Sequence, residues 1–192
     1  MITIVDTGGA NINSVLFSLK RIDVSYRFAT GPEDIMKAEK ILLPGVGSAK
    51  NAMKRLEDHG VVKALQQTKA NILGICLGMQ LLFEKSEEGD VDCLGLLPGK
   101  VEKIKSTGLS LPHMGWNQLI VSGESPFDIF KGEYVYFVHS YRAQMNDTVL
   151  LYAEYGEKIP AIVGRGNYYG TQFHPEKSAD VGERILKRFI EL

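Results

Sequence analysis

The stretch that most constrains the fold of this 192-residue chain is Gly74–Gln80, which reads Gly-Ile-Cys-Leu-Gly-Met-Gln and follows the apolar run Asn71–Leu73. A nucleophile with a glycine two residues away on either side, where a strand meets a helix, is typical of a nucleophile elbow. The glycines let the chain turn sharply, so the central side chain projects above the sheet. We therefore expect Cys76 to stand at a strand end, where the N–H groups of the next helix favour its thiolate.

The competing interpretation of Cys76 is structural, because free cysteines commonly pack as small apolar side chains. The chain has one other cysteine, Cys93, in the polar run Glu87–Leu97, which carries no elbow pattern, and we interpret it as structural. The sequence alone leaves a disulfide between the two open without favouring it. Two further motifs decide the matter in favour of a nucleophilic Cys76.

The second motif is His174-Pro175-Glu176, which directly follows the strand-like run Tyr168–Phe173. Proline fixes its own φ and keeps the preceding residue extended, so His174 and Glu176 can project to the same side. A thiol, an imidazole and a carboxylate make a triad in which the base moves the proton and the acid fixes its tautomer. Alone, the motif would fit a surface turn equally well. Beside the elbow, it favours a catalytic base with its orienting carboxylate.

The third motif is Pro44–Gly47, a glycine-rich turn at the end of the apolar strand-like run Ile41–Leu43. Such a turn presents bare N–H groups, and acyl transfer needs preorganised donors for the oxyanion that develops. We expect one donor from Leu77, the residue after the nucleophile, and others from Val46 and Gly47. By itself a Pro-Gly-x-Gly run is usually only a turn.

Together the three motifs, in this order and spacing, resemble those of the class I (triad) glutamine amidotransferases, and the resemblance covers nearly the whole chain. Within this family the chain is most similar to the glutaminase subunits of imidazole glycerol phosphate synthases. The segments that carry this finer resemblance are Asp6–Ser14, Pro44–Gly47, Pro112–Asn117 and Tyr136–Arg142. Pro-His-Met-Gly-Trp-Asn is the most specific of them. At Thr7–Ala10 the chain departs from many relatives, which carry a tyrosine and a differently placed glycine.

The resemblance implies a glutaminase that needs no cofactor. The Cys76 thiolate would attack the side-chain amide of L-glutamine, His174 would protonate the departing ammonia, and water would hydrolyse the thioester while Glu176 orients His174. It also implies a heterodimer with a cyclase subunit, a (β/α)8 barrel. The cyclase would receive ammonia through an internal channel and convert the nucleotide PRFAR into imidazole glycerol phosphate and AICAR in L-histidine biosynthesis.

The resemblance also assigns residues beyond the triad. The oxyanion and substrate-binding residues would be Val46, Gly47, Leu77, Gln80, His139, Ser140 and Tyr141. The partner interface would include Asn11, Met114, Trp116, Tyr136 and Lys177. Without the resemblance, Gln80 would be interpreted as an exposed helical residue, His139 as a hydrogen-bonded histidine at a strand end, and Trp116 as part of the core.

Charge and hydropathy argue against several other classes. Lys and Arg number 22 against 23 Asp and Glu, with no long basic block, so nucleic acid is not an expected partner. No apolar run approaches the ~20 residues of a membrane span, and strand-like Ile2–Val5 at the start leaves no room for a signal peptide. No His, Cys, Asp or Glu cluster has metal-ligand spacing, so we expect no metal. We therefore expect a cytoplasmic protein, which also suits a reactive thiol without a disulfide framework.

The periodicity predicts one domain, residues 1–192, with the α/β fold of class I glutamine amidotransferases: an open mixed, largely parallel, flavodoxin-like sheet flanked by helices, with added antiparallel strands. Strands are expected at Ile2–Asp6, Ile41–Leu43, Ile72–Ile75, Lys100–Lys105, Glu133–Val138, Val149–Tyr155, Ala161–Arg165 and Tyr168–Phe173. Helices are expected at Ile12–Arg21, Ala49–Leu56 with Ser48 as its N-cap, Val61–Thr68 and Ala179–Ile190. Pro112–Asn117 is expected as a loop or a short extended piece. The site should lie at the carboxyl ends of the strands.

Three alternatives stay open at this point. A paralogous glutaminase could feed ammonia to another acceptor, such as a nucleotide-sugar amidation partner, because the partner chooses the acceptor. A cysteine hydrolase or stress protein could share the sheet, although it would not explain His174-Pro175-Glu176 together with Gln80. A scaffold without activity could dock a partner, but a complete triad argues against it.

Overall fold

The centre of the molecule is a mixed sheet, seen in a computed structural model that describes residues 1–8, 12–105 and 108–192. Within these residues the sheet has eight strands, in the spatial order β2-β1-β3-β4-β14-β13-β12-β9. Their bounds are β1 Ile2–Ile4, β2 Tyr26–Phe28, β3 Lys40–Gly45, β4 Asn71–Cys76, β9 Ile120–Val121, β12 Val149–Glu154, β13 Lys158–Arg165 and β14 Tyr168–Thr171. The strands from β2 to β14 run parallel, and β13, β12 and β9 continue the sheet antiparallel. The predicted mixed, largely parallel sheet is confirmed.

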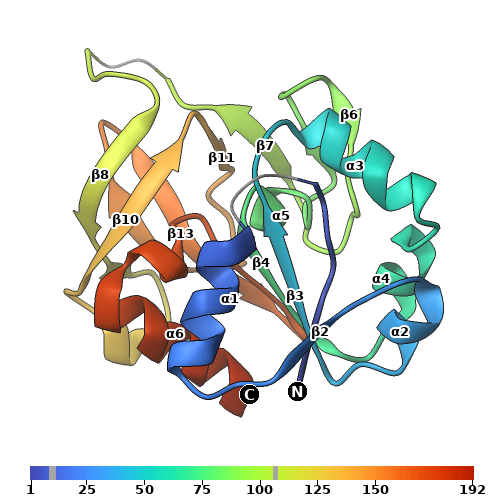
Figure 1. Cartoon of the computed structure of the whole chain (residues 1–192). Coiled ribbons are helices and arrows are strands. Elements are labelled where there is room, and N and C mark those ends of the chain that lie inside the picture. Colours follow the sequence, from blue (N-terminus) through green and yellow to red (C-terminus); the bar gives the residue numbers. More distant parts are fainter. Residues whose placement is uncertain (9–11, 106–107) are drawn as a thin grey trace.

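Helices cover both faces of the parallel part (Figure 1). Helices α1 and α6 lie on one face, and α2, α3 and α4 lie on the other. Their bounds are α1 Ile12–Arg21, α2 Pro32–Met36, α3 Ala49–Asp58, α4 Val62–Gln67 and α6 Ala179–Glu191. Strands that are buried on both faces need apolar side chains at successive positions. The continuous apolar runs in the sequence therefore become the inner strands.

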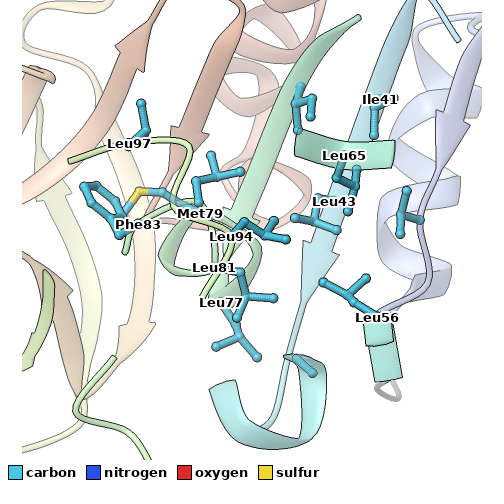
Figure 2. Packing of buried hydrophobic residues seen from close by; sticks show 14 of the residues in the cluster. Ile41, Leu43, Leu56, Leu65, Leu77, Met79, Leu81, Phe83, Leu94 and Leu97 are labelled. Carbon is cyan, nitrogen blue, oxygen red and sulfur yellow. The ribbon is translucent and has the colours of Figure 1, made fainter. Parts of the chain in front are cut away.

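Strand β3 shows how the two faces are built. Its Leu42 packs in the cluster that contains Val15 of α1 and Phe189 of α6. Its neighbours Ile41 and Leu43 point to the opposite face, because successive side chains on a strand alternate. Figure 2 shows this second cluster, in which residues of β3 meet Leu56 and Leu65 of the covering helices.

Smaller sheets lie beside the central one. Strands β8 and β10 pair antiparallel, and the order β11-β7-β5-β6 forms another sheet. Their bounds are β5 Lys85–Ser86, β6 Val91–Asp92, β7 Lys100–Lys103, β8 His113–Gln118, β10 Tyr134–His139 and β11 Tyr141–Ala143. Short helical turns complete the described chain: α5 Leu77–Gln80, η1 Asp128–Phe130 and η2 Pro175–Lys177. The chain passes from β10 to β11 at Ser140, so this residue stands between the two smaller sheets.

Most long elements begin and end within two residues of their predicted bounds, and α1 agrees at both ends. The segment Pro112–Asn117, expected as a loop or short extended piece, is mostly strand β8. The short elements β2, α2, β5 and β6 had no counterpart in the sequence expectations. Ser48 occupies the predicted N-cap position, but its side chain makes no capping bond. The carboxylate of Glu88 accepts the N–H of Ala49 instead, at 2.8 Å.

Candidate active site

The elbow at Cys76 is held in a strained conformation by close backbone packing. Cys76 has φ 54° and ψ −110°, a region that side chains other than glycine rarely adopt. A Cβ on Gly78 would lie 1.7 Å from the carbonyl oxygen of Leu43, and a Cβ on Gly74 would lie 2.5 Å from the Gly78 backbone. The two glycines are therefore required because β3, β4 and α5 approach one another with no room for side chains.

His174 and Glu176 lie next to Cys76, although they are about a hundred residues away in sequence. Strands β4 and β14 pair in parallel, with Thr171 opposite Ile75, so their carboxyl ends meet at one edge of the sheet. Nδ1 of His174 lies 2.7 Å from Oε1 of Glu176, and both side chains are almost fully buried. Cys76 and His174 line the same cleft, and the Cys76 side chain is close enough to raise the pKa of His174. The structure thus brings the three predicted triad residues together.

The electrostatics of His174 favour a charged imidazolium. Burial alone would lower the pKa of His174, but hydrogen bonds to Cys76 and Glu176, together with their negative charges, raise it to about 10. At neutral pH the imidazole ring of His174 is therefore charged. A positive imidazolium beside the sulfur favours the thiolate that nucleophilic attack requires.

The main chain around His174 is bonded to strand β10. The N–H of His174 donates to the carbonyl of Tyr136 at 3.0 Å. The buried hydroxyl of Ser178 donates to the carbonyl of His174 at 2.7 Å and accepts the N–H of Tyr136 at 3.0 Å. Ser178 stands at the N-cap position of α6, yet its side chain makes no bond to that helix. Its hydroxyl therefore connects two segments that a sequence pattern could not have joined.

A cleft of about 500 Å³ opens in front of Cys76 and His174. All seven residues of the predicted oxyanion and substrate-binding set line it, together with Glu88, Val138 and Lys177. Gly45 stands opposite Cys76 in the register of β3 and β4, which brings the following Val46 and Gly47 beside the sulfur. Gly47 has φ 98°, a conformation that favours glycine.

Gln80 is buried at the floor of this cleft, so its interpretation as an exposed helical residue is wrong. Its Nε2 donates to the carbonyl of Tyr141 at 2.8 Å and to Oε1 of Gln172 at 3.0 Å. Because both amide hydrogens are committed, its Oε1 is the atom left to receive a ligand. The sequence reasoning did not single out Gln172 or Glu88. Glu88 sits in an acidic run typical of a solvated surface, and only the structure shows that it caps Ala49 of α3 and lines the cleft.

His139 lines the cleft and is also hydrogen-bonded. Its Nδ1 lies 2.8 Å from the carbonyl of Tyr141, and its Nε2 lies 3.0 Å from Nδ1 of His113. His113 stacks between the rings of Phe137 and Tyr155, at centroid distances of 4.8 and 4.0 Å. Burial lowers the pKa of both histidines, that of His139 to about 3. His139 is therefore neutral at pH 7 and holds the Tyr141 backbone at the cleft wall.

Beside the cleft, the pair β8 and β10 exposes an apolar surface. Tyr136 pairs with Trp116 and Val138 with Met114, so these side chains share one face of the pair. Met114 is 59% exposed and Trp116 is 50% exposed, which makes the interpretation of Trp116 as core wrong. We call Met114, Trp116 and Tyr136 the β8–β10 face. Lys177 is also exposed, whereas the predicted interface residue Asn11 lies outside the described residues.

Other features constrain the chemistry. Cys76 and Cys93 are both free, and burial together with the nearby Asp92 charge raises the pKa of Cys93 to about 12. Cys93 is thus a poor nucleophile.

Within residues 1–8, 12–105 and 108–192, no cluster of three or more His, Cys, Asp or Glu could hold a metal ion. In the same ranges, no helix combines the length and the apolar character needed to cross a membrane.

Comparison with known proteins places this geometry in context. Residues 3–192 match the family model of class-I glutamine amidotransferases. Imidazole glycerol phosphate synthase subunit HisH of Idiomarina loihiensis is 44% identical over 191 residues, covering 100% of this chain and 97% of that protein. The HisH subunit of Xanthomonas campestris pv. campestris is 45% identical over 194 residues, with coverages of 100% and 97%.

Solved structures show the same fold at lower sequence identity. One described as a glutamine amidotransferase has a TM-score of 0.77 and 19% identity, and the match covers 99% of this chain and 97% of that one. PurLQS from Thermotoga maritima has a TM-score of 0.72 and 23% identity, with coverages of 99% and 97%.

Proposed function

We propose that this chain, which belongs to the class-I glutamine amidotransferase family, is the glutaminase subunit of an imidazole glycerol phosphate synthase. It hydrolyses L-glutamine to glutamate and ammonia and passes the ammonia to a cyclase subunit in L-histidine biosynthesis. The observation that carries the proposal is the buried contact of Cys76, His174 and Glu176 at the head of the cleft. The similarity to HisH subunits over the full chain supports the histidine-pathway acceptor.

Catalysis begins with attack of the Cys76 thiolate on the side-chain amide carbon of glutamine. The oxyanion is stabilised by backbone N–H groups of Val46, Gly47 and Leu77. The imidazolium of His174 gives its proton to the departing nitrogen, so ammonia leaves and a glutamyl thioester remains. Water then attacks the thioester, His174 takes a proton from it, and glutamate leaves as the thiolate re-forms. The balance is one glutamine and one water to one glutamate and one ammonia.

The cleft walls account for recognition of the amino-acid end of glutamine. Gln80 and Glu88 both line the cleft and each has a side-chain oxygen that can accept a hydrogen bond, and an ammonium group requires such acceptors. We assign them to the α-ammonium group. His139 keeps Ser140 and Tyr141 in place at the cleft through its bond to the Tyr141 carbonyl.

The β8–β10 face is the docking surface for the cyclase in this proposal. It exposes apolar side chains that a stable complex would cover. Strand β10 also contributes Val138 to the cleft wall, so product released there is close to the partner. Ammonia that escaped into neutral water would be protonated and lose its nucleophilic lone pair, which is the reason for transfer within a complex. The reactive thiol suits the reducing cytoplasm, where we place the protein.

The proposal is tested by glutamate release from glutamine, first by the chain alone and then with the cyclase from the same source and PRFAR. We expect strong stimulation when both are present. Glutamine hydrolysis that ignores this cyclase would keep the triad and assign a different acceptor. The absence of hydrolysis under every condition would overturn the glutaminase function.

A further inference from the structure

Gln172, which is not one of the three triad residues, contacts the sulfur of Cys76. It follows β14 directly, and its side chain is fully buried. Its Nε2 lies 3.8 Å from Sγ of Cys76, within reach of an N–H···S hydrogen bond. Its own N–H donates to the carbonyl of Ala161 on β13 at 2.9 Å, which fixes the main chain below it. The amide is thus held against Cys76 by the central sheet.

The hydrogen-bond pattern fixes which end of the amide faces the sulfur. The carbonyl of Tyr141 can only accept, so the group of Gln80 that faces it must be the NH₂. The second hydrogen of that NH₂ then points to Gln172 at 3.0 Å, which must present its oxygen. The NH₂ of Gln172 is left facing Cys76. Through two successive hydrogen bonds, the Tyr141 carbonyl therefore determines that Gln172 presents a donor, and not an acceptor, to the sulfur of Cys76.

We propose that Gln172 is a further catalytic residue, whose amide N–H donates to the sulfur of Cys76 and stabilises its negative charge. A donor at this position favours thiolate over thiol, since hydrogen bonds to a charged acceptor are stronger than those to a neutral one. The same contact supports the thiolate as it leaves the carbonyl carbon during thioester hydrolysis. This second role rests on the proposed glutaminase function, whereas the first does not.

The test measures alkylation of Cys76 by iodoacetamide between pH 5 and pH 10, with the modified residue resolved by mass spectrometry. The variant Gln172→Met keeps a similar volume and removes the donor. The matched control is Thr171→Val at the neighbouring buried position, because Thr171 Oγ1 has no hydrogen-bond partner among the described residues. Cys93, whose pKa burial and the nearby Asp92 charge raise to about 12, should stay largely unmodified in this range, so its alkylation in any sample reports unfolding.

We expect Gln172→Met to raise the pH of half-maximal Cys76 alkylation by about one unit. At any pH well below that midpoint, the variant should then hold about tenfold less thiolate than the parent chain. Thr171→Val should match the parent chain. Superimposable pH profiles for the two variants would overturn the proposal. If Gln172→Met does not melt cooperatively, Gln172→Glu, which keeps the shape but presents acceptors, carries the same expectation.

Glutamine hydrolysis separates this inference from the proposed function. With active parent protein, Gln172→Met should lower kcat for glutamate release about tenfold or more and change KM less than threefold, because the amide contacts sulfur and not substrate. A loss confined to KM would overturn the catalytic role. If the parent chain hydrolyses no glutamine, the proposed function fails while the alkylation profiles still decide the role of Gln172.

Discussion

The elbow at residues 74–80 and the turn at residues 174–178 each position one residue of the proposed triad, but by different means. Cys76 is positioned by close backbone contacts between β3, β4 and α5, which leave no space for a side chain at Gly74 or Gly78. His174 is set by one direct hydrogen bond to Tyr136 of strand β10 and by the Ser178 hydroxyl, which bridges the His174 carbonyl and the Tyr136 N–H. The nucleophile thus depends on steric fit inside the sheet. The base depends on a strand whose exposed face is the proposed docking surface.

Replacement of Gly78 should disrupt the elbow conformation. In Gly78→Ala the new Cβ would fall 1.7 Å from the Leu43 carbonyl oxygen, so β3 or α5 must move. We expect loss of cooperative folding, or a folded protein without Cys76 reactivity, by thermal melting and iodoacetamide labelling. Gly123→Ala, where a Cβ would meet nothing within 4 Å, is the matched control. A Gly78→Ala protein with parental stability and labelling would disprove the steric account.

A substitution in the turn should lower the catalytic rate while the protein stays folded. Glu176→Gln preserves the shape of the side chain but removes the charge that supports the His174 imidazolium. We expect kcat for glutamate release to fall roughly 10²- to 10⁴-fold, the usual range for acid–base catalysis. Glu133→Gln, a surface carboxylate paired with Arg184, should be silent. A Glu176→Gln variant with more than a third of parental kcat would remove Glu176 from the triad.

Truncation of the β8–β10 face should weaken docking without touching the elbow. Trp116 is half exposed and contacts only its neighbour Tyr136 among aromatic rings of the described residues, at a centroid distance of 5.9 Å. We expect Trp116→Ala to weaken binding of the cyclase roughly 30-fold, the effect of one interface hot spot. Calorimetric titration measures it. Tyr26→Ala, an exposed aromatic on edge strand β2, should leave the affinity unchanged. Equal affinities for both variants would move the docking surface elsewhere.

Loss of the Ser178 hydroxyl should affect His174 and Cys76 differently, because the hydroxyl supports the main chain of His174 and does not contact the elbow. Ser178→Ala removes the bonds to Tyr136 and to the His174 carbonyl. One hydrogen bond contributes about 1 kcal/mol, so we expect a five- to tenfold lower kcat. Rapid alkylation of Cys76 should persist. Ser18→Ala, another fully buried serine, should keep the parental kcat. An unchanged kcat in Ser178→Ala would mean that the base needs no support from β10.

The most gradual expected effect is a pH dependence of stability with opposite signs at two histidines. His174 has a pKa raised to about 10, so its stabilisation is complete below ~6.5 and is lost as the pH rises toward 10. His139 has a pKa lowered to about 3, so its contribution is lost as the pH falls from ~6.5 toward 3. Urea midpoints against pH should therefore flatten on the alkaline side in His174→Asn. An alkaline slope that is the same in this variant and the parent would contradict the charged state of His174.

Only those parts of the molecule that have a local signal in the sequence were predictable from it. Cys76, the glycines around it and the long elements were predictable because their signals are local: apolar runs, helical periodicity and a seven-residue motif. Trp116 and Gln80 could be placed only by resemblance, since a lone tryptophan or helical glutamine has no local signal. Ser178, Gln172 and Glu88 were missed because their partners Tyr136, Cys76 and Ala49 are far away in sequence. The short strands β5 and β6 were missed because two residues carry no periodicity.

The most direct test of the account is covalent labelling with a diazo-ketone analogue of glutamine, carried out on the complex with the cyclase and followed by peptide mapping. We expect one equivalent of label on Cys76, protection by excess glutamine, and no label on Cys93. Label on Cys93, or a folded complex in which Cys76 stays unmodified, would contradict the assignment of Cys76 as the nucleophile that attacks glutamine.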